Sequence, residues 1–203
     1  PSVQRTVRRT KGRITGLEGP ATAALVAINV IVYLITVAQG NGLNAPGGEL
    51  ISDGVLVGAA IDQNGDWYRL VSAMFLHGSV IHLAFNMFAL YWLGTVVEQA
   101  LGTWRYLLVY FVSGIAGSAG ALLLSGPLTQ TVGASGAIYG ILGALLILEY
   151  MTTGSFAGQA LGIILLNFMI TLTVPNISLG GHLGGLVGGV LATFGLMHFR
   201  YSK

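Results

Sequence analysis

The chain has 203 residues, of which 54% are hydrophobic and only 8% are charged. Soluble domains carry about 25% charged residues, so this composition excludes a water-exposed globular protein. The absence of cysteine excludes disulfides and thiolate metal sites, the net charge of +2 is small, and the 31 glycines favour closely packed membrane helices.

Six segments of the chain are apolar over about the 20 residues that a membrane-spanning helix needs. They are residues 21–39, 80–97, 104–124, 135–150, 156–174 and 182–199. The connections after the second segment are short, so the later helices are expected to form one compact bundle. We therefore expect an all-α membrane protein in which six transmembrane helices occupy residues 21–199, between a basic N-terminal segment (1–20) and a short tail (200–203).

The basic residues indicate how these helices cross the membrane. If the N-terminus is cytoplasmic, eight of the nine lysines and arginines lie on the cytoplasmic side, and only Arg69 lies outside. The eight are Arg5, Arg8, Arg9, Lys11, Arg13, Arg105, Arg200 and Lys203. The chain is therefore expected to be a multi-pass membrane protein with both termini in the cytoplasm.

The long connection between the first two helices is expected to face outward. Its acidic residues are Glu49, Asp53, Asp62 and Asp66. Residues 67–76 within it form an amphipathic stretch that is too short to span a membrane. This stretch predicts an interfacial segment that lies against the bundle.

Two of the expected helices begin beside polar residues framed by glycine. Ser135 lies in the segment Gly133-Ala134-Ser135-Gly136 at the start of the fourth helix, and His182 follows two glycines at the start of the sixth. In the expected orientation, the second, fourth and sixth helices all begin on the outer side. Ser135, His182, His82 and Asn86 are therefore expected at one depth, just below the outer surface.

Small residues at three- and four-residue spacing form one smooth face on each of the fourth and sixth helices. The faces comprise Gly136, Gly140, Gly143 and Ala144 on the fourth helix, and Gly181, Gly184, Gly185 and Gly188 on the sixth. Small faces let helix backbones approach closely. Close approach is what a hydrogen bond between Ser135 and His182 requires.

Serine becomes an effective nucleophile when a neighbouring base accepts its proton, and His182 is the candidate base for Ser135. The carboxylates of Glu98 and Glu149 fall at the inner ends of their helices, so we expect a Ser–His dyad rather than a triad with a carboxylate. Tyr139 lies one turn below Ser135 on the same face and is expected to orient the His182 ring by packing.

Donors for a developing oxyanion lie at the same depth. The fourth helix supplies free backbone N–H groups at its N-terminus, and His82 and Asn86 share a helix face. His77 is expected to serve the structure of the outer loop or a water-retaining cavity. A metal site is not expected, because no His-Glu-x-x-His motif or outer helical carboxylate accompanies His77 and His82.

In combination, these features resemble the rhomboid family of intramembrane serine proteases over residues 21–199. The resemblance implies a catalytic Ser135–His182 dyad that forms an acyl-enzyme, oxyanion binding by His82 and Asn86, and supporting roles for Tyr139 and Gly133. The motifs that carry it are Trp67-x-Arg69, His77 with His82 and Asn86, Glu98 with Gly102, Gly133-Ala134-Ser135-Gly136 with Tyr139, and Gly181-His182 with Gly185 and Gly189.

The resemblance also implies the partners and the location of the protein. Its substrates would be transmembrane proteins, which enter from the surrounding membrane lipid and are cleaved near the outer membrane boundary. No cofactor, metal or nucleic acid is implied. The glycine-dense helices and short tails are typical of a bacterial member, so a bacterial plasma membrane is the expected location.

Two other functions remain open from the sequence. One is a catalytically silent rhomboid-like protein that binds or escorts membrane helices, and the other is a small transporter or channel. Inactive rhomboid relatives lack the serine or the histidine, or carry proline in the Gly-x-Ser-Gly loop, and this chain shows none of these departures. A transporter is expected to show internal repeats, broken helices or an ionisable path across the membrane, whereas the polar groups here lie in the outer half.

Overall fold

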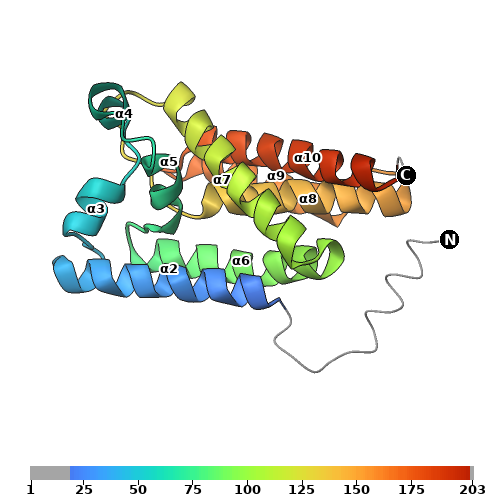
Figure 1. Cartoon of the computed structure of the whole chain (residues 1–203), viewed down its shortest axis with the longest axis horizontal. Helices are drawn as coiled ribbons and strands as arrows, with labels where there is room; N and C mark the ends of the chain where they lie inside the picture. Colours follow the sequence, from blue (N-terminus) through green and yellow to red (C-terminus); the bar gives the residue numbers. More distant parts are fainter. Residues whose placement is uncertain (1–18, 202–203) are drawn as a thin grey trace.

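The computed structural model describes residues 19–201, which fold into a bundle of helices (Figure 1). The expected N-terminal segment lies almost entirely outside the described residues, as do the last two residues of the expected tail. Among the described residues there is no strand, which confirms the all-α class. The long helices are α2 (Pro20–Gln39), α6 (Val80–Leu101), α7 (Thr103–Leu124), α8 (Ser135–Thr153), α9 (Gln159–Thr173) and α10 (Leu179–Tyr201).

Five helices in the described part of the chain are long and apolar enough to cross a membrane, namely α2, α6, α7, α8 and α10. The helix α9 has 15 residues. At about 1.5 Å per residue, α9 is shorter than the ~30 Å of hydrocarbon in a bilayer. The expected fifth span, 156–174, is therefore shorter than predicted, and five of the six expected spans have full length.

The outward faces of these helices are apolar. Phe85, Leu123 and Leu191 expose 73%, 83% and 65% of their surface. Acyl chains solvate such faces, while the helices satisfy their backbone hydrogen bonds internally. The chain is accordingly an integral, multi-pass membrane protein.

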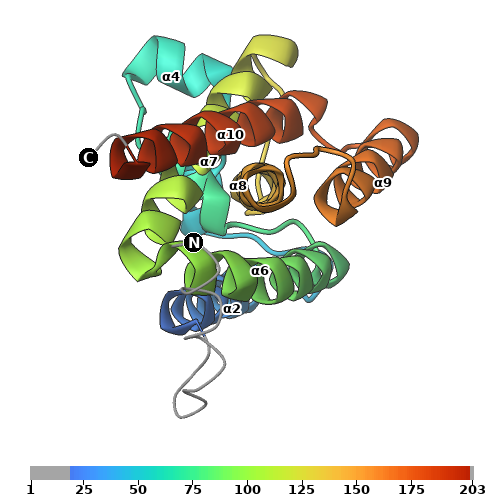
Figure 2. The same cartoon turned by 90° about the vertical axis from the view of Figure 1, so that its right-hand side faces the viewer.

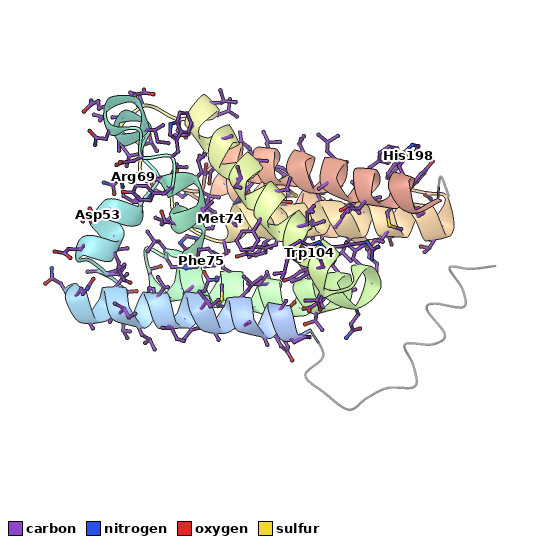
Figure 3. All side chains as sticks on the ribbon, in the orientation of Figure 1. Asp53, Arg69, Met74, Phe75, Trp104 and His198 are labelled. Atoms are coloured by element: carbon purple, nitrogen blue, oxygen red, sulfur yellow. The ribbon has the colours of Figure 1, made fainter. Side chains whose placement is uncertain are left out.

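The connection between α2 and α6 folds into short helices at one end of the bundle, where α6, α8 and α10 begin (Figure 1). Figure 3 shows Asp53 and Arg69 at this end and His198 at the opposite end. Both candidate catalytic residues lie on helices that begin beside these short elements. The short elements are α3 (Glu49–Gly54), α4 (Gly58–Asn64), α5 (Arg69–Ser72) and the 3₁₀ helix η1 (Ala73–Phe75).

Arg69 joins the parts of this connection. Its side chain is buried, and its guanidinium donates to the Asp66 carboxylate at 3.0 Å and to the backbone carbonyl oxygens of Ser52 and Val55 at 2.9 Å each. Because each donor of a buried cation needs a partner, these bonds fix α3 against α5. The connection is thereby a folded unit that lies beside the beginnings of α6 and α8.

Glycines bring α7, α8 and α10 into backbone contact. A methyl group placed on Gly136 of α8 would lie 3.3 Å from both the Gly117 Cα of α7 and the Gly181 carbonyl oxygen of α10. A methyl group on Gly185 of α10 would overlap the Gly136 carbonyl oxygen. Figure 2 shows these three helices grouped together, with α9 to the side of α8. The glycine faces expected on α8 and α10 therefore do meet, and α7 joins them as a third helix.

Two carboxylates near helix ends accept hydrogen bonds from the first N–H groups of other helices. Glu98 on α6 accepts from two N–H groups at the start of α2, at 3.1 and 2.8 Å. Glu149 on α8 accepts from the N–H groups of Gln159 and Ala160, at 2.9 and 3.0 Å. Negative charge is favourable at a helix N-terminus. Glu149 therefore sets the start of α9 at Gln159, later than the expected residue 156.

Candidate active site

Ser135 is the first residue of α8 and is half-buried. The turn before it needs glycine, because Gly133 has a φ of +125°, which residues with a side chain rarely adopt. The Gly133 N–H donates to the Ala73 carbonyl oxygen of η1 at 2.9 Å. No side chain caps α8 at Ala134. The first N–H groups of a helix have no intrahelical partner, so α8 presents donors beside the Ser135 hydroxyl.

His82 and Asn86 lie against this turn from α6. A methyl group on Gly133 would lie 2.8 Å from His82 Nε2 and 3.4 Å from Asn86 Nδ2. Asn86 is 7% exposed, and its Nδ2 has no hydrogen-bond partner in the described part of the protein. A buried amide donor without a partner is costly. Its position next to Gly133 makes it available to an acceptor beside Ser135.

His182 lies in the first turn of α10, and its ring is fixed by two neighbours. The Tyr139 ring of α8 stacks on it, with a centroid distance of 3.9 Å and an interplanar angle of 17°. Its Nδ1 lies 2.7 Å from the Thr171 hydroxyl oxygen of α9. The same hydroxyl lies 2.9 Å from the Tyr139 hydroxyl. Three helices therefore determine the orientation of one imidazole, which is 6% exposed.

Ser135 and His182 lie at the same end of the α8–α10 contact, because their neighbours Gly136 and Gly181 approach each other. Among the described residues, no hydrogen bond joins the two side chains. Catalytic hydrogen bonds often tighten only when substrate binds. The structure therefore brings the two residues to neighbouring helix starts without showing the proton-transfer contact itself.

Thr171 is the site residue that the sequence reasoning missed. It is one of three buried residues on α9, a helix with a largely exposed apolar surface. Its signal in the sequence is the spacing Asn167-x-x-x-Thr171, which puts two polar groups on one face of an otherwise apolar segment. This polar face points to a role in the site only once the structure shows that α9 packs beside His182.

His77 is fully buried in the loop before α6, and its ring meets the His82 ring edge to face at 5.0 Å. Burial and, to a lesser extent, the nearby His82 lower the pKa of His77 to about 3, against the opposing effect of a hydrogen bond with the Phe75 backbone. His77 is therefore neutral in the folded protein at neutral pH. A neutral ring here is consistent with a structural role in the loop.

The low pKa of His77 predicts a pH-dependent stability. Between about pH 6.5 and pH 3, the unfolded chain binds a proton at His77 that the folded chain does not, so stability should fall as the pH falls through this range. In His77→Gln this contribution is absent, and the thermal midpoint in detergent should depend less on pH. An equal dependence of the thermal midpoint on pH in His77→Gln and in wild type would contradict the prediction.

A family model described as the Rhomboid domain matches residues 64–199 of the chain. The chain belongs to the rhomboid family. Its relatives include the rhomboid protease GluP of Bacillus subtilis (strain 168), 35% identical over 179 residues, which cover 86% of this chain but 34% of GluP. The putative rhomboid protease YdcA of the same organism is 38% identical over 137 residues, covering 64% of this chain and 68% of YdcA. RHOMBOID-like protein 5 of Arabidopsis thaliana is 33% identical over 141 residues, covering 66% of this chain and 46% of that relative.

The described residues of this rhomboid contain no group of three or more His, Cys, Asp or Glu side chains that could hold a metal ion. The carboxylates of Glu98 and Glu149 accept hydrogen bonds from the first N–H groups of α2 and α9, away from Ser135. The polar groups that do gather at Ser135 are a hydroxyl, imidazoles and an amide. Such a set suits acyl transfer by a nucleophile and a base.

Proposed function

We propose that this rhomboid is an intramembrane serine endopeptidase with Ser135 as nucleophile and His182 as general base. The observation that carries the proposal is the meeting of three features at one end of the bundle. They are the uncapped start of α8 at Ser135, the unpartnered Asn86 amide against Gly133, and the doubly oriented His182 ring. Each feature has a separate task in acyl transfer.

In the proposed reaction, His182 accepts the proton of Ser135 as the hydroxyl oxygen attacks a peptide carbonyl carbon. The carbonyl oxygen becomes an oxyanion, which the Ser135 N–H, His82 and Asn86 stabilise by hydrogen bonds. The intermediate collapses to an acyl-enzyme as His182 returns the proton to the leaving amine. Water then attacks the ester with His182 again as base, which regenerates Ser135.

We propose transmembrane proteins as the substrates, with cleavage near the outer membrane boundary and both termini of the enzyme in the cytoplasm. The placement of the basic residues supports this orientation. Ser135 and His182 both lie at the beginnings of helices, at the end of the bundle that carries α3, α4 and α5. In the proposed orientation that end faces outward, so the scissile bond would lie shallow in the membrane.

The proposal is tested by reconstituting the protein in liposomes with single-span substrates that carry a label at each end. We expect cleavage near the outer end of the span and none of a soluble unstructured peptide of the same sequence. If none of several single-span substrates is cleaved but the protein still binds them, a catalytically silent binding protein would replace the protease.

Packing of α8 against α10 is expected to be necessary for this activity. In Gly185→Ala, the added methyl group overlaps the Gly136 carbonyl oxygen, so the helices must separate and carry Ser135 away from His182. A misplacement of about 1 Å is expected to lower kcat by about 10²-fold. The control Gly195→Ala lies on the same helix with open space around the new methyl group, and it should keep wild-type activity. Equal activity of both variants would contradict the packing account.

A further inference from the structure

We propose that Thr171 is a positioning residue that sets the tautomer of His182, so that Nδ1 carries the proton and Nε2 is free to act as the base. The inference rests on the proposed function and deepens it, because it names the group that takes the place of a triad carboxylate. Thr171 lies on α9, whereas the nucleophile lies on α8 and the base on α10. The base would therefore be oriented by a third helix.

The Thr171 hydroxyl group has more hydrogen-bond partners than it has protons to donate. A threonine hydroxyl donates one hydrogen bond and accepts two. The Thr171 oxygen has three partners, namely the Asn167 carbonyl oxygen at 2.8 Å, the Tyr139 hydroxyl at 2.9 Å and His182 Nδ1 at 2.7 Å. A carbonyl oxygen only accepts, so the single proton of Thr171 goes to Asn167.

The other two contacts must then be bonds that Thr171 accepts. Tyr139 donates its O–H, and His182 donates from a protonated Nδ1. A neutral imidazole carries one proton, so Nε2 is left with a free lone pair. That is the tautomer a general base needs, since the Ser135 proton must have a nitrogen to move to. If Thr171 instead donated its proton to His182 Nδ1, no proton would lie between the Thr171 oxygen and the Asn167 carbonyl oxygen, which are 2.8 Å apart.

Tyr139 has two functions in this arrangement. Its ring stacks on His182, and its hydroxyl occupies the remaining acceptor site of Thr171. Thr171 itself is 6% exposed, so water does not readily substitute for it. The orientation of the base consequently depends on the packing of α9, which contributes only three buried residues to the bundle.

The test compares two substitutions of Thr171 with a control on the same helix. Thr171→Val keeps the shape but removes the hydroxyl, whereas Thr171→Ser keeps the hydroxyl. The control is Thr173→Val, because the Thr173 hydroxyl is exposed and bonds only carbonyl oxygens of its own helix. We expect Thr171→Val to lower kcat by at least about 10-fold with little change in KM, Thr171→Ser to restore most of the rate, and Thr173→Val to behave as wild type.

The tautomer is measured directly by NMR of protein labelled with ¹⁵N-histidine in detergent, with the His182 signals assigned from the spectrum of His182→Gln. We expect the Nδ1–H form in wild type and in Thr171→Ser, and a mixture or the Nε2–H form in Thr171→Val. An Nε2–H form in wild type would overturn the proposal even if Thr171→Val fails to fold. Because this readout needs no substrate, it separates failure of the tautomer proposal from failure of the proposed protease activity.

Discussion

Replacing Ser135 with alanine is expected to lower cleavage of a membrane-embedded substrate by at least about 10³-fold, to the background of the assay. The substitution removes one oxygen atom from a half-buried residue whose side chain makes no hydrogen bond in the described structure. Alanine is also compatible with the first turn of a helix. The thermal midpoint should therefore change little, and the loss of rate should come from the missing nucleophile.

The matched control for this substitution is Ser113→Ala. Ser113 is buried on α7, and its hydroxyl donates to the Val109 carbonyl oxygen within its own helix. Its removal should leave the rate of cleavage within a few-fold of wild type. If Ser135→Ala retains cleavage, or if both variants lose it equally, Ser135 is not the nucleophile.

Replacing Asn86 with leucine is expected to lower kcat by about 10²- to 10³-fold with a much smaller effect on KM, as is typical of the loss of one oxyanion donor. Leucine has a similar volume, but it lacks the Nδ2 group that lies against Gly133. That nitrogen has no partner among the described residues, so the folded state loses no hydrogen bond.

The prediction for Asn86 therefore separates catalysis from stability. Thermal unfolding in the same detergent should show Asn86→Leu to be at least as stable as wild type, because a buried unpaired donor is replaced by an apolar side chain. A large fall in the thermal midpoint together with an unchanged kcat would assign Asn86 to the fold and not to the oxyanion.

The helices were predictable from the sequence where a long apolar segment was enough to define them. The apolar segments of α2, α6, α7, α8 and α10 lie within a few residues of the expected ranges, because a bilayer requires long apolar helices whatever their neighbours are. The start of α8 at Ser135 follows from the glycine at position 133, which breaks the helix before it. Apolar segment length and a helix-breaking glycine are local properties, so they can be read from the sequence without knowledge of the packing.

The start and length of α9 were not predictable from hydropathy. Phe156 is apolar and belongs to the expected span, but the helix begins at Gln159, where the Glu149 carboxylate accepts two backbone N–H bonds. That carboxylate lies on another helix, so its effect depends on the packing of α8 beside α9.

The residues of the candidate site also fall into those that the sequence could predict and those that depend on packing. Ser135, His182, His82 and Asn86 could be named from their residue types and their common depth. Thr171 could not, because threonine is common in membrane helices and its importance comes from being 2.7 Å from His182 Nδ1. The sequence predicted a dyad oriented by Tyr139 alone, whereas the structure adds a hydroxyl from α9.

The most direct test of the central claim, that His182 activates Ser135, is reaction with a fluorophosphonate followed by mass-spectrometric mapping of the modified residue. The account predicts one adduct per chain, located on Ser135, with a rate that falls by at least about 10³-fold in His182→Ala. A single adduct on another residue, or reaction of Ser135 at an equal rate in His182→Ala, would contradict it.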